Sequence, residues 1–173
     1  RSLEFDSVGV ANFELRYPDV GRIALNARHE GSGESEGLVL IGNGSFVARP
    51  AYFNLDIPGN PAATGVAEGN VFRSAGEAFS VTVSARNVDD QITPNFGRES
   101  APESVALTPS LVAPVGGFLP SLGGAFGGFG EDCNGDVAQA GSACGEFNWP
   151  EVGIISLEPS LVSGAYLGSE NVT

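Results

Sequence analysis

The chain has 173 residues, which suits one large domain or one and a half small ones. Its 21 acidic residues outnumber eight basic ones, all arginine, and the net charge of −13 opposes binding to nucleic acid or anionic lipid. The apolar fraction of 42% rules out general disorder, and no apolar run approaches the roughly 18 residues of a membrane-spanning helix. Because the chain has neither Met nor a targeting segment, we expect it to be an excerpt of a longer protein.

Two strands are predicted near the N-terminus. Residues 8–17 carry alternating apolar side chains, with a parity slip near Ala11 that suggests a β-bulge. Residues 21–28 alternate again and place three apolar side chains on one face: Ile23, Leu25 and Ala27. The acidic, Gly- and Ser-rich stretch 30–37 that follows predicts a solvated loop.

A third strand region leads to a module boundary. Residues 38–49 predict a strand pair or one bent strand that ends at Arg49-Pro50, where we place the boundary. Beyond it, apolar residues alternate from Phe53 to Ile57, and the Pro-Gly-Asn-Pro sequence 58–61 ends that strand.

The clearest strand follows the turn residues 75–77. Its inward side chains are predicted to be Phe79, Val81, Val83 and Ala85, and its outward ones Ser80, Thr82, Ser84 and Arg86. Residues 87–90 (Asn-Val-Asp-Asp) predict a turn, and a short strand is expected to start with Ile92, Pro94 and Phe96.

The last third of the chain contains two more strand regions around a long Gly-rich segment. Residues 104–113 alternate, residues 116–146 form a Gly-rich excursion with both cysteines, and residues 147–149 and 153–158 flank a corner. No stretch shows a convincing helical apolar stripe. Short strands spaced about 8–12 residues apart predict an all-β chain, built as an antiparallel immunoglobulin-like sandwich.

An internal repeat indicates two modules of one type. Residues 15–25 read LRYPDVGRIAL and residues 147–157 read FNWPEVGIISL, an offset of 132 positions from Pro18 to Pro150. Proline ends one strand and glycine permits a tight corner, so each copy predicts strand, corner, strand. We therefore expect residues 1–49 to be the C-terminal strands of a first module, and residues 50–173 to be a second module that includes the loop 116–146.

The second module is predicted to lack its last strand, because little sequence follows its corner strand. One hypothesis is that the N-terminal strands of one copy complete the open edge of a neighbouring copy, which would make the protein a self-assembling filament subunit. The alternative is that the sequence is a truncated or incompletely traced part of the protein.

Cys133 and Cys144 are predicted to form one disulfide, because their count is even and no His or further Cys lies near enough to share a zinc ion. Such a bridge implies an oxidising compartment. Asp132, Asn134 and Asp136 alternate like the start of a calcium loop, but Val137 and Ala143 stand where that loop needs Gly and Glu. We therefore expect no cofactor and keep Ca²⁺ as a weak alternative to a solvated turn.

No catalytic site is predicted. The pattern Gly-x-Ser-x-Gly at residues 33–37 resembles a hydrolase nucleophile elbow, but a strand follows it where that elbow needs a helix. The single histidine, His29, is expected on the surface at a strand end. Asp19 and Glu151 recur at equivalent corner positions, which favours turn formation over a pair of catalytic carboxylates.

Aromatic residues offer the clearest candidates for contact with a partner. Trp149 takes the position of Tyr17 in the repeat, so we expect it to be buried at a corner. Phe118, Phe126 and Phe129 lie in Gly-rich sequence that does not force burial. If exposed, they would form a loop tip suited to a partner or a sugar ring.

Four segments resemble the C-terminal region of MshQ-like proteins: residues 15–25, residues 44–50 (GSFVARP), residues 95–97 (NFG) and residues 147–153 (FNWPEVG). These proteins accompany the mannose-sensitive haemagglutinin type IV pilus of Gram-negative bacteria. The resemblance implies a large, exported, multi-domain protein at a pilus or cell surface, with a role in adhesion and no catalytic residues to carry over.

The sequence thus predicts a non-enzymatic, structural or adhesive segment of an extracellular bacterial surface protein. Its expected partners are other domains of the same chain or other copies through strand pairing, pilus subunits or surface glycans. A carbohydrate-binding module is the alternative that exposed coplanar aromatic rings would favour.

Overall fold

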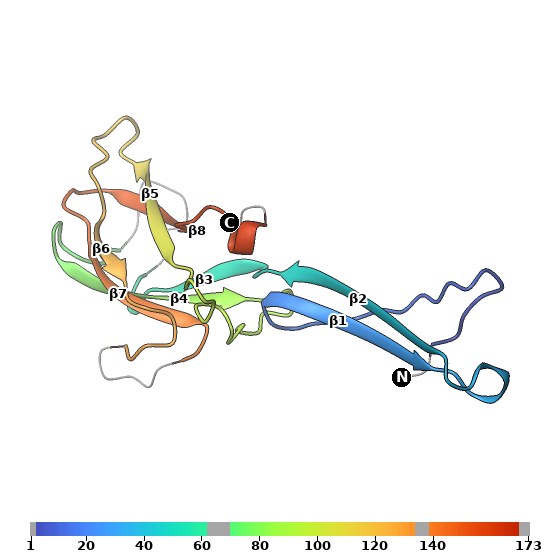
Figure 1. Cartoon of the computed structure of the whole chain (residues 1–173). Helices are drawn as coiled ribbons and strands as arrows, with labels where there is room; N and C mark the ends of the chain where they lie inside the picture. Colours follow the sequence, from blue (N-terminus) through green and yellow to red (C-terminus); the bar gives the residue numbers. More distant parts are fainter. Residues whose placement is uncertain (1–2, 62–69, 134–138, 170–173) are drawn as a thin grey trace.

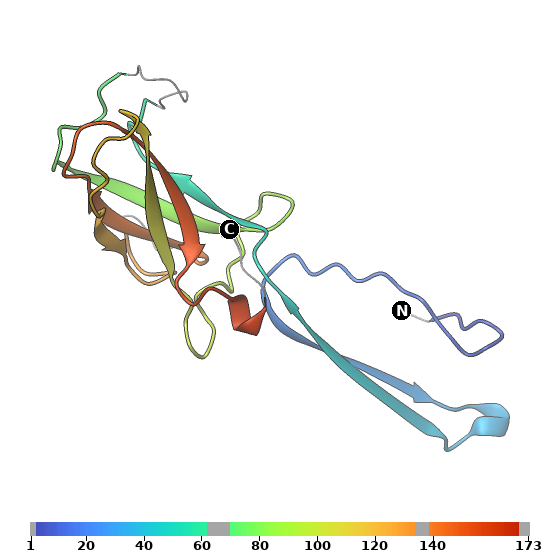
Figure 2. The ribbon, with the colours of Figure 1, turned by 90° about the horizontal axis from the view of Figure 1, so that it is seen from above.

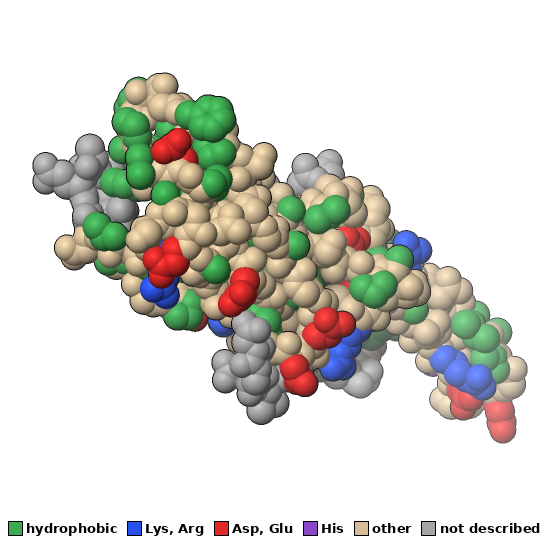
Figure 3. Space-filling view, turned by 90° about the vertical axis from the view of Figure 1, so that its left-hand side faces the viewer, with side chains coloured by type: hydrophobic (Ala, Val, Ile, Leu, Met, Phe, Trp, Pro, Cys, Tyr) green, Lys and Arg blue, Asp and Glu red, His purple; other side chains and the backbone are tan. Residues whose placement is uncertain are grey.

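The computed structural model describes residues 3–61, 70–133 and 139–169. Within these ranges the chain forms antiparallel β-strands and two single-turn 3-10 helices, Gly33–Ser35 (η1) and Tyr166–Gly168 (η2), with no α-helix (Figure 1). The all-β prediction is confirmed. Acidic side chains are scattered over the face shown in Figure 3, with arginines beside some of them.

The N-terminal strands form a long hairpin. Strand β1 (Gly21–Glu30) pairs over its full ten residues with β2 (Val39–Ala48), and the predicted loop 30–37 contributes the turn with η1. Residues 38–49 are therefore one strand and not a strand pair. Figure 2 shows the hairpin projecting away from the rest of the molecule. Most of its side chains are exposed because it has no second layer to pack against along its outer length.

The remaining strands form two facing sheets. The larger sheet has the order β3-β4-β7-β6, built from β3 (Tyr52–Asp56), β4 (Ala78–Arg86), β7 (Ser142–Asn148) and β6 (Gly123–Phe126). The smaller sheet pairs β5 (Val105–Ala113) with β8 (Ile154–Leu161). An immunoglobulin constant-type sandwich has seven strands, with A-B-E-D in one sheet and C-F-G in the other. The second module therefore has this topology with the position of strand G, beside β8, unfilled among the described residues.

The sandwich core consists of two clusters of buried side chains. The inner cluster contains Val20, Phe53, Val83, Ala85, Phe96, Val105, Ala143, Leu161 and Tyr166, and the end cluster contains Phe79, Val81, Phe147 and Trp149. Strand β4 contributes its alternate residues to both, as its period-two pattern predicts. Ser84, expected to face solvent, is buried on the opposite face, where its Oγ lies 2.9 Å from Ser142 Oγ.

The strand predicted at residues 8–17 does not form. Residues 8 and 9 lie in a turn, residues 10–17 form no regular secondary structure and pair with no other described segment, and Val8, Val10, Phe13, Leu15 and Tyr17 are exposed. By the repeat, residues 10–16 correspond to β7, which is held between β4 and β6. A strand is stable only with hydrogen-bonded neighbours, and no described residue takes the place of those two neighbours here.

Two further predictions need correction. Residues 92–97 form an isolated bridge from Ile92 to Arg86 and then a turn, not a short strand. The Gly-rich segment 116–146 is partly regular, because β6 and most of β7 lie within it. Gly124 allows this close pairing: a Cβ there would lie 2.1 Å from the Glu146 carbonyl oxygen.

Candidate functional site

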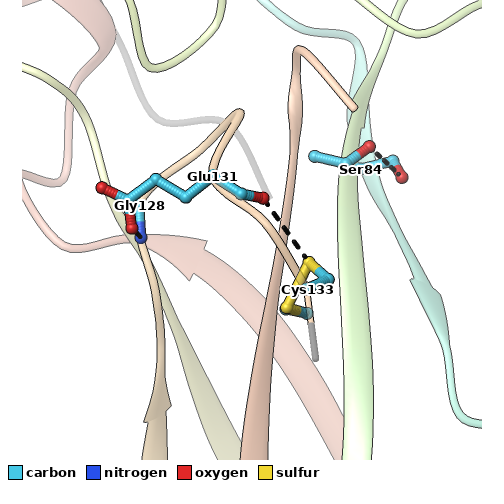
Figure 4. The surroundings of a disulfide bond; sticks show 6 residues. Ser84, Gly128, Glu131 and Cys133 are labelled. Carbon is cyan, nitrogen blue, oxygen red and sulfur yellow. Dashed lines mark hydrogen bonds between the residues drawn. A yellow bond between two sulfur atoms is a disulfide. The ribbon is translucent and has the colours of Figure 1, made fainter. Parts of the chain in front are cut away.

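The predicted disulfide is present and ties the Gly-rich loop to β7. Cys133 and Cys144 are bonded, with their Cα atoms 5.6 Å apart (Figure 4). The side chain of Glu131 turns back along the loop, and its Oε2 accepts a hydrogen bond from the Gly128 amide at 3.0 Å. The bridge thus holds a loop whose glycines would otherwise leave it many conformations.

Only one of the three candidate calcium ligands lies within the described residues. Asp132 is described, but Asn134 and Asp136 lie outside the described ranges. Within those ranges, no three His, Cys, Asp or Glu side chains cluster closely enough to hold a metal ion. Calcium binding therefore stays a prediction.

The residues that resemble a nucleophile elbow lie in the turn of the hairpin. Ser35 is exposed, and its hydroxyl donates a hydrogen bond to the Ser32 carbonyl at 3.0 Å. His29 is exposed in β1, opposite Leu40 in β2. The turn has a strand on both sides, so the strand-to-helix geometry that aims such a serine does not arise here.

The three phenylalanines proposed as a contact surface are not exposed together. Phe118 is 71% exposed, whereas Phe126 and Phe129 are partly buried and pack against the core. The Phe126 ring meets Phe147 edge-on at 4.9 Å between centroids, and Phe129 meets Phe96 at 4.6 Å. Sandwich packing overrides local flexibility because each buried ring removes a large apolar area from water.

The repeated corner has the same geometry in both modules. Val20 N donates to Asp19 Oδ1 at 2.8 Å, and Val152 N donates to Glu151 Oε1 at 2.8 Å. The next residue is glycine in both, with φ of 133° at Gly21 and 144° at Gly153. The acidic residue is thus a turn former, as predicted, and the shared Pro-acid-Val-Gly sequence specifies one local structure.

The first corner packs against the second module. Asn87 Nδ2 donates to the Pro18 carbonyl at 2.7 Å, and the Asn95 amide donates to Asp19 Oδ1 at 3.2 Å. Arg16 forms an exposed ion pair with Asp89. Val20 enters the inner cluster and is only 2% exposed. The sequence predicted the turn 87–90. Nothing in the sequence indicated that this turn would contact the corner of the first module.

Among the described residues, the second corner has no such cover. Val152, the counterpart of Val20, is 67% exposed. Beside it, a recess of about 700 Å³ opens between the end of β3, residues 70–77 and the first half of β8. Trp149 is 8% exposed there, as predicted for a corner residue, and its indole N–H has no partner among the described residues.

Two tyrosines have raised pKa values. Burial raises the pKa of Tyr166, and its hydroxyl donates a hydrogen bond to Glu99 Oε1 at 2.7 Å, which acts in the same direction. The pKa of Tyr52 is raised because its hydroxyl donates to Asp90 at the surface. Both shifts follow from burial and from hydrogen bonds to carboxylates, so we assign them to the packing of the module.

No helix among the described residues is long and apolar enough to cross a membrane. The family model described as "DUF6701, second domain" matches residues 49–143, and that described as "Domain of unknown function (DUF6701), first Ig-like domain" matches residues 1–43. No curated protein and no solved structure matches the chain.

Proposed function

Because the chain belongs to the DUF6701 family, we propose that it serves as a structural and adhesive segment of an exported bacterial surface protein of the MshQ-like, pilus-associated kind. Immunoglobulin-like domains in tandem are typical of structural segments, in which stacked modules set the length and stiffness of a stalk. The segment would act as a stiff spacer and as a surface that contacts a partner, without catalysis.

The packed junction between the two modules is the observation that carries this proposal. Val20 is buried in the core of the second module, and two hydrogen bonds from Asn87 and Asn95 fix the corner that precedes β1. The chain passes directly from β2 through Arg49-Pro50 into β3, and the Ala51 amide donates to the Arg86 carbonyl at 2.7 Å. A short connection with buried contacts favours a stiff joint over a flexible linker.

The disulfide supports export, since such bonds persist in oxidising compartments. The carbohydrate-binding alternative loses support because only Phe118 of the three candidate rings is well exposed. Strand exchange that uses β1 or β2 would have to break a hairpin that pairs over ten residues.

The test is antibody labelling of intact, piliated Gram-negative cells that produce the full-length protein. We expect labelling without permeabilisation, and lower pilus-dependent haemagglutination when the purified chain is added as competitor. The chain unfolded by reduction and alkylation in urea is the matched control and should not compete. Labelling only after permeabilisation would contradict the proposed location, and full haemagglutination despite the competitor would contradict the adhesive role.

A further inference from the structure

The loop between β5 and β6 carries no charged residue. All 21 acidic and all eight basic residues of the chain lie outside residues 104–130, which span β5, this loop and β6. The tip of the loop, residues 114–119, reads PVGGFL, and none of these side chains can form a hydrogen bond. The tip therefore differs in chemistry from the rest of a chain that has a net charge of −13.

The tip projects from one end of the sandwich. Figure 1 shows the β5–β6 loop reaching beyond the ends of the strands, and Figure 3, turned about the vertical axis, shows hydrophobic side chains gathered at this upper end with an acidic side chain among them. Residues 114–119 are all exposed, with Val115 at 96%, Phe118 at 71% and Leu119 at 49%. Neighbouring apolar side chains with this exposure are typical of a surface that contacts a partner.

Several backbone donors at the tip are absent or already paired. Pro114 and Pro120 have no N–H, and the Gly117 amide donates a hydrogen bond to the Pro114 carbonyl at 3.1 Å. A backbone group that leaves water without a partner costs free energy, so each donor that is absent or paired lowers this cost. The side chains of Val115 and Phe118 can therefore enter an apolar phase with a reduced backbone penalty.

The second corner extends the apolar surface at this end. Ala113 pairs with Ile154 across the small sheet, so the corner that precedes Ile154 lies beside the base of the loop. Val152 in this corner is exposed. The acidic residue of the corner, Glu151, is half-buried, and its Oε1 accepts a hydrogen bond from the Val152 amide. A carboxylate beside the tip disfavours contact with a negatively charged surface.

We propose that the tip of the β5–β6 loop inserts Val115 and Phe118 into the surface of a phospholipid bilayer with zwitterionic headgroups. Recognition of a sugar or of a protein pocket usually includes hydrogen bonds from side chains, and residues 114–119 offer none. A lipid interface requires only apolar side chains that reach about 5–10 Å into it. The net charge of −13 favours a surface without negative charge. This contact goes beyond the proposed function and does not depend on it.

The probe is a vesicle of phosphatidylcholine, mixed with the full chain and separated from unbound protein by flotation. We expect the native chain to float with these vesicles. Phe118→Ser should weaken binding by about tenfold, because it replaces a large apolar side chain that leaves water on insertion. Val115→Ser should weaken binding by a similar factor for the same reason.

Val162→Ser is the matched control. Val162 is also an exposed valine, but it follows β8 at the opposite end of the small sheet, so its substitution should leave vesicle binding unchanged. All of these substitutions are at exposed positions and should leave the fluorescence of the buried Trp149 unchanged, which verifies the fold.

The variant Phe118→Trp tests insertion directly. Phosphatidylcholine brominated on its acyl chains should quench the added tryptophan and leave Trp149 unquenched, because only the tip enters the bilayer. Absence of flotation, absence of quenching, or equal losses in Val115→Ser and Val162→Ser would overturn the proposal. Tighter binding to vesicles of phosphatidylglycerol would overturn the choice of a zwitterionic surface. Dimers that form without lipid and are abolished by Val115→Ser would assign the tip to a second copy instead.

Discussion

At the scale of single residues, the environment of each aromatic ring decides its role more than its local sequence does. Phe118, Phe126 and Phe129 all lie in Gly-rich sequence, yet only Phe118 extends into solvent. Phe126 packs between the two sheets against Phe147, and Phe129 packs on Phe96. Side chains of one type thus divide into one surface residue and two core residues.

Replacing Phe126 by Ala should lower the free energy of unfolding by about 2–3 kcal/mol, since it removes a partly buried ring and leaves a cavity. Urea denaturation followed by tryptophan fluorescence measures the change. Phe118→Ala, at the exposed ring, is the matched control and should shift stability by less than about 0.5 kcal/mol. Equal effects of the two substitutions would contradict the packing described for Phe126.

Stability should depend on Tyr166 at alkaline pH. Its pKa is raised in the folded chain, so the folded state keeps its proton at a pH where the unfolded state releases it. The contribution is therefore fully present below pH about 10 and is lost as pH rises above that value, at no more than about 1.4 kcal/mol per pH unit.

The check is urea denaturation between pH 8 and pH 11, with Tyr166→Phe as comparison. Phenylalanine cannot ionise, so this variant should lose about 1 kcal/mol at pH 8 through the missing Glu99 hydrogen bond and then decline less steeply than the native chain. Parallel curves for the two proteins would show that other groups govern the alkaline decline.

At the scale of elements, the disulfide links the loop after β6 to β7, and glycine lets β6 pair closely with β7. Cys144 lies within β7, and Cys133 lies in the loop that leads out of β6. The bridge limits the conformations of the unfolded loop, while β6 needs Gly124 to approach β7 closely. A segment that looks irregular by composition therefore contains a stabilised edge of the large sheet.

Loss of the bridge should cost about 3 kcal/mol in unfolding free energy, the value expected for a short closed ring. The double variant Cys133→Ser, Cys144→Ser should show this loss in urea. The native chain measured with a reductant should match the variant within about 0.5 kcal/mol, since both lack the same bond. If the urea midpoint were unchanged in both the double variant and the reduced chain, native contacts alone would order the loop.

At the scale of the whole molecule, the two modules are joined at the first corner, and their equivalent corners differ in what covers them. The first corner is held by the Asn87 and Asn95 hydrogen bonds and by burial of Val20. The second corner has the same backbone geometry and an exposed Val152. The pair allows a comparison of one side chain in two surroundings.

Val20→Ala should therefore lower the unfolding free energy by about 2 kcal/mol, whereas Val152→Ala should change it by less than about 0.5 kcal/mol. Both substitutions remove the same atoms from the same local structure, so the difference isolates the contribution of the junction. Thermal and urea unfolding provide the values. Similar small losses at both positions would contradict a firmly packed junction.

Much of the fold could be predicted from the sequence, because it follows from local chemistry. Alternation predicted β1, β3, β4, β5 and β8; proline and glycine predicted the corners; and two nearby cysteines predicted the disulfide. Each of these depends on a few neighbouring residues and on rules that hold wherever such residues occur.

The tertiary structure decided which segments with a strand pattern pair with another strand and which apolar side chains are buried. Residues 8–17 have a strand pattern but no strand beside them, so they stay unpaired, and Phe126 and Phe129 are partly buried because they pack against core residues. Val20 and Val152 share the sequence Pro-acid-Val-Gly and the same hydrogen bond, yet one is buried and the other exposed. Burial depends on what lies across from a residue in space, and a short run of sequence does not contain that information.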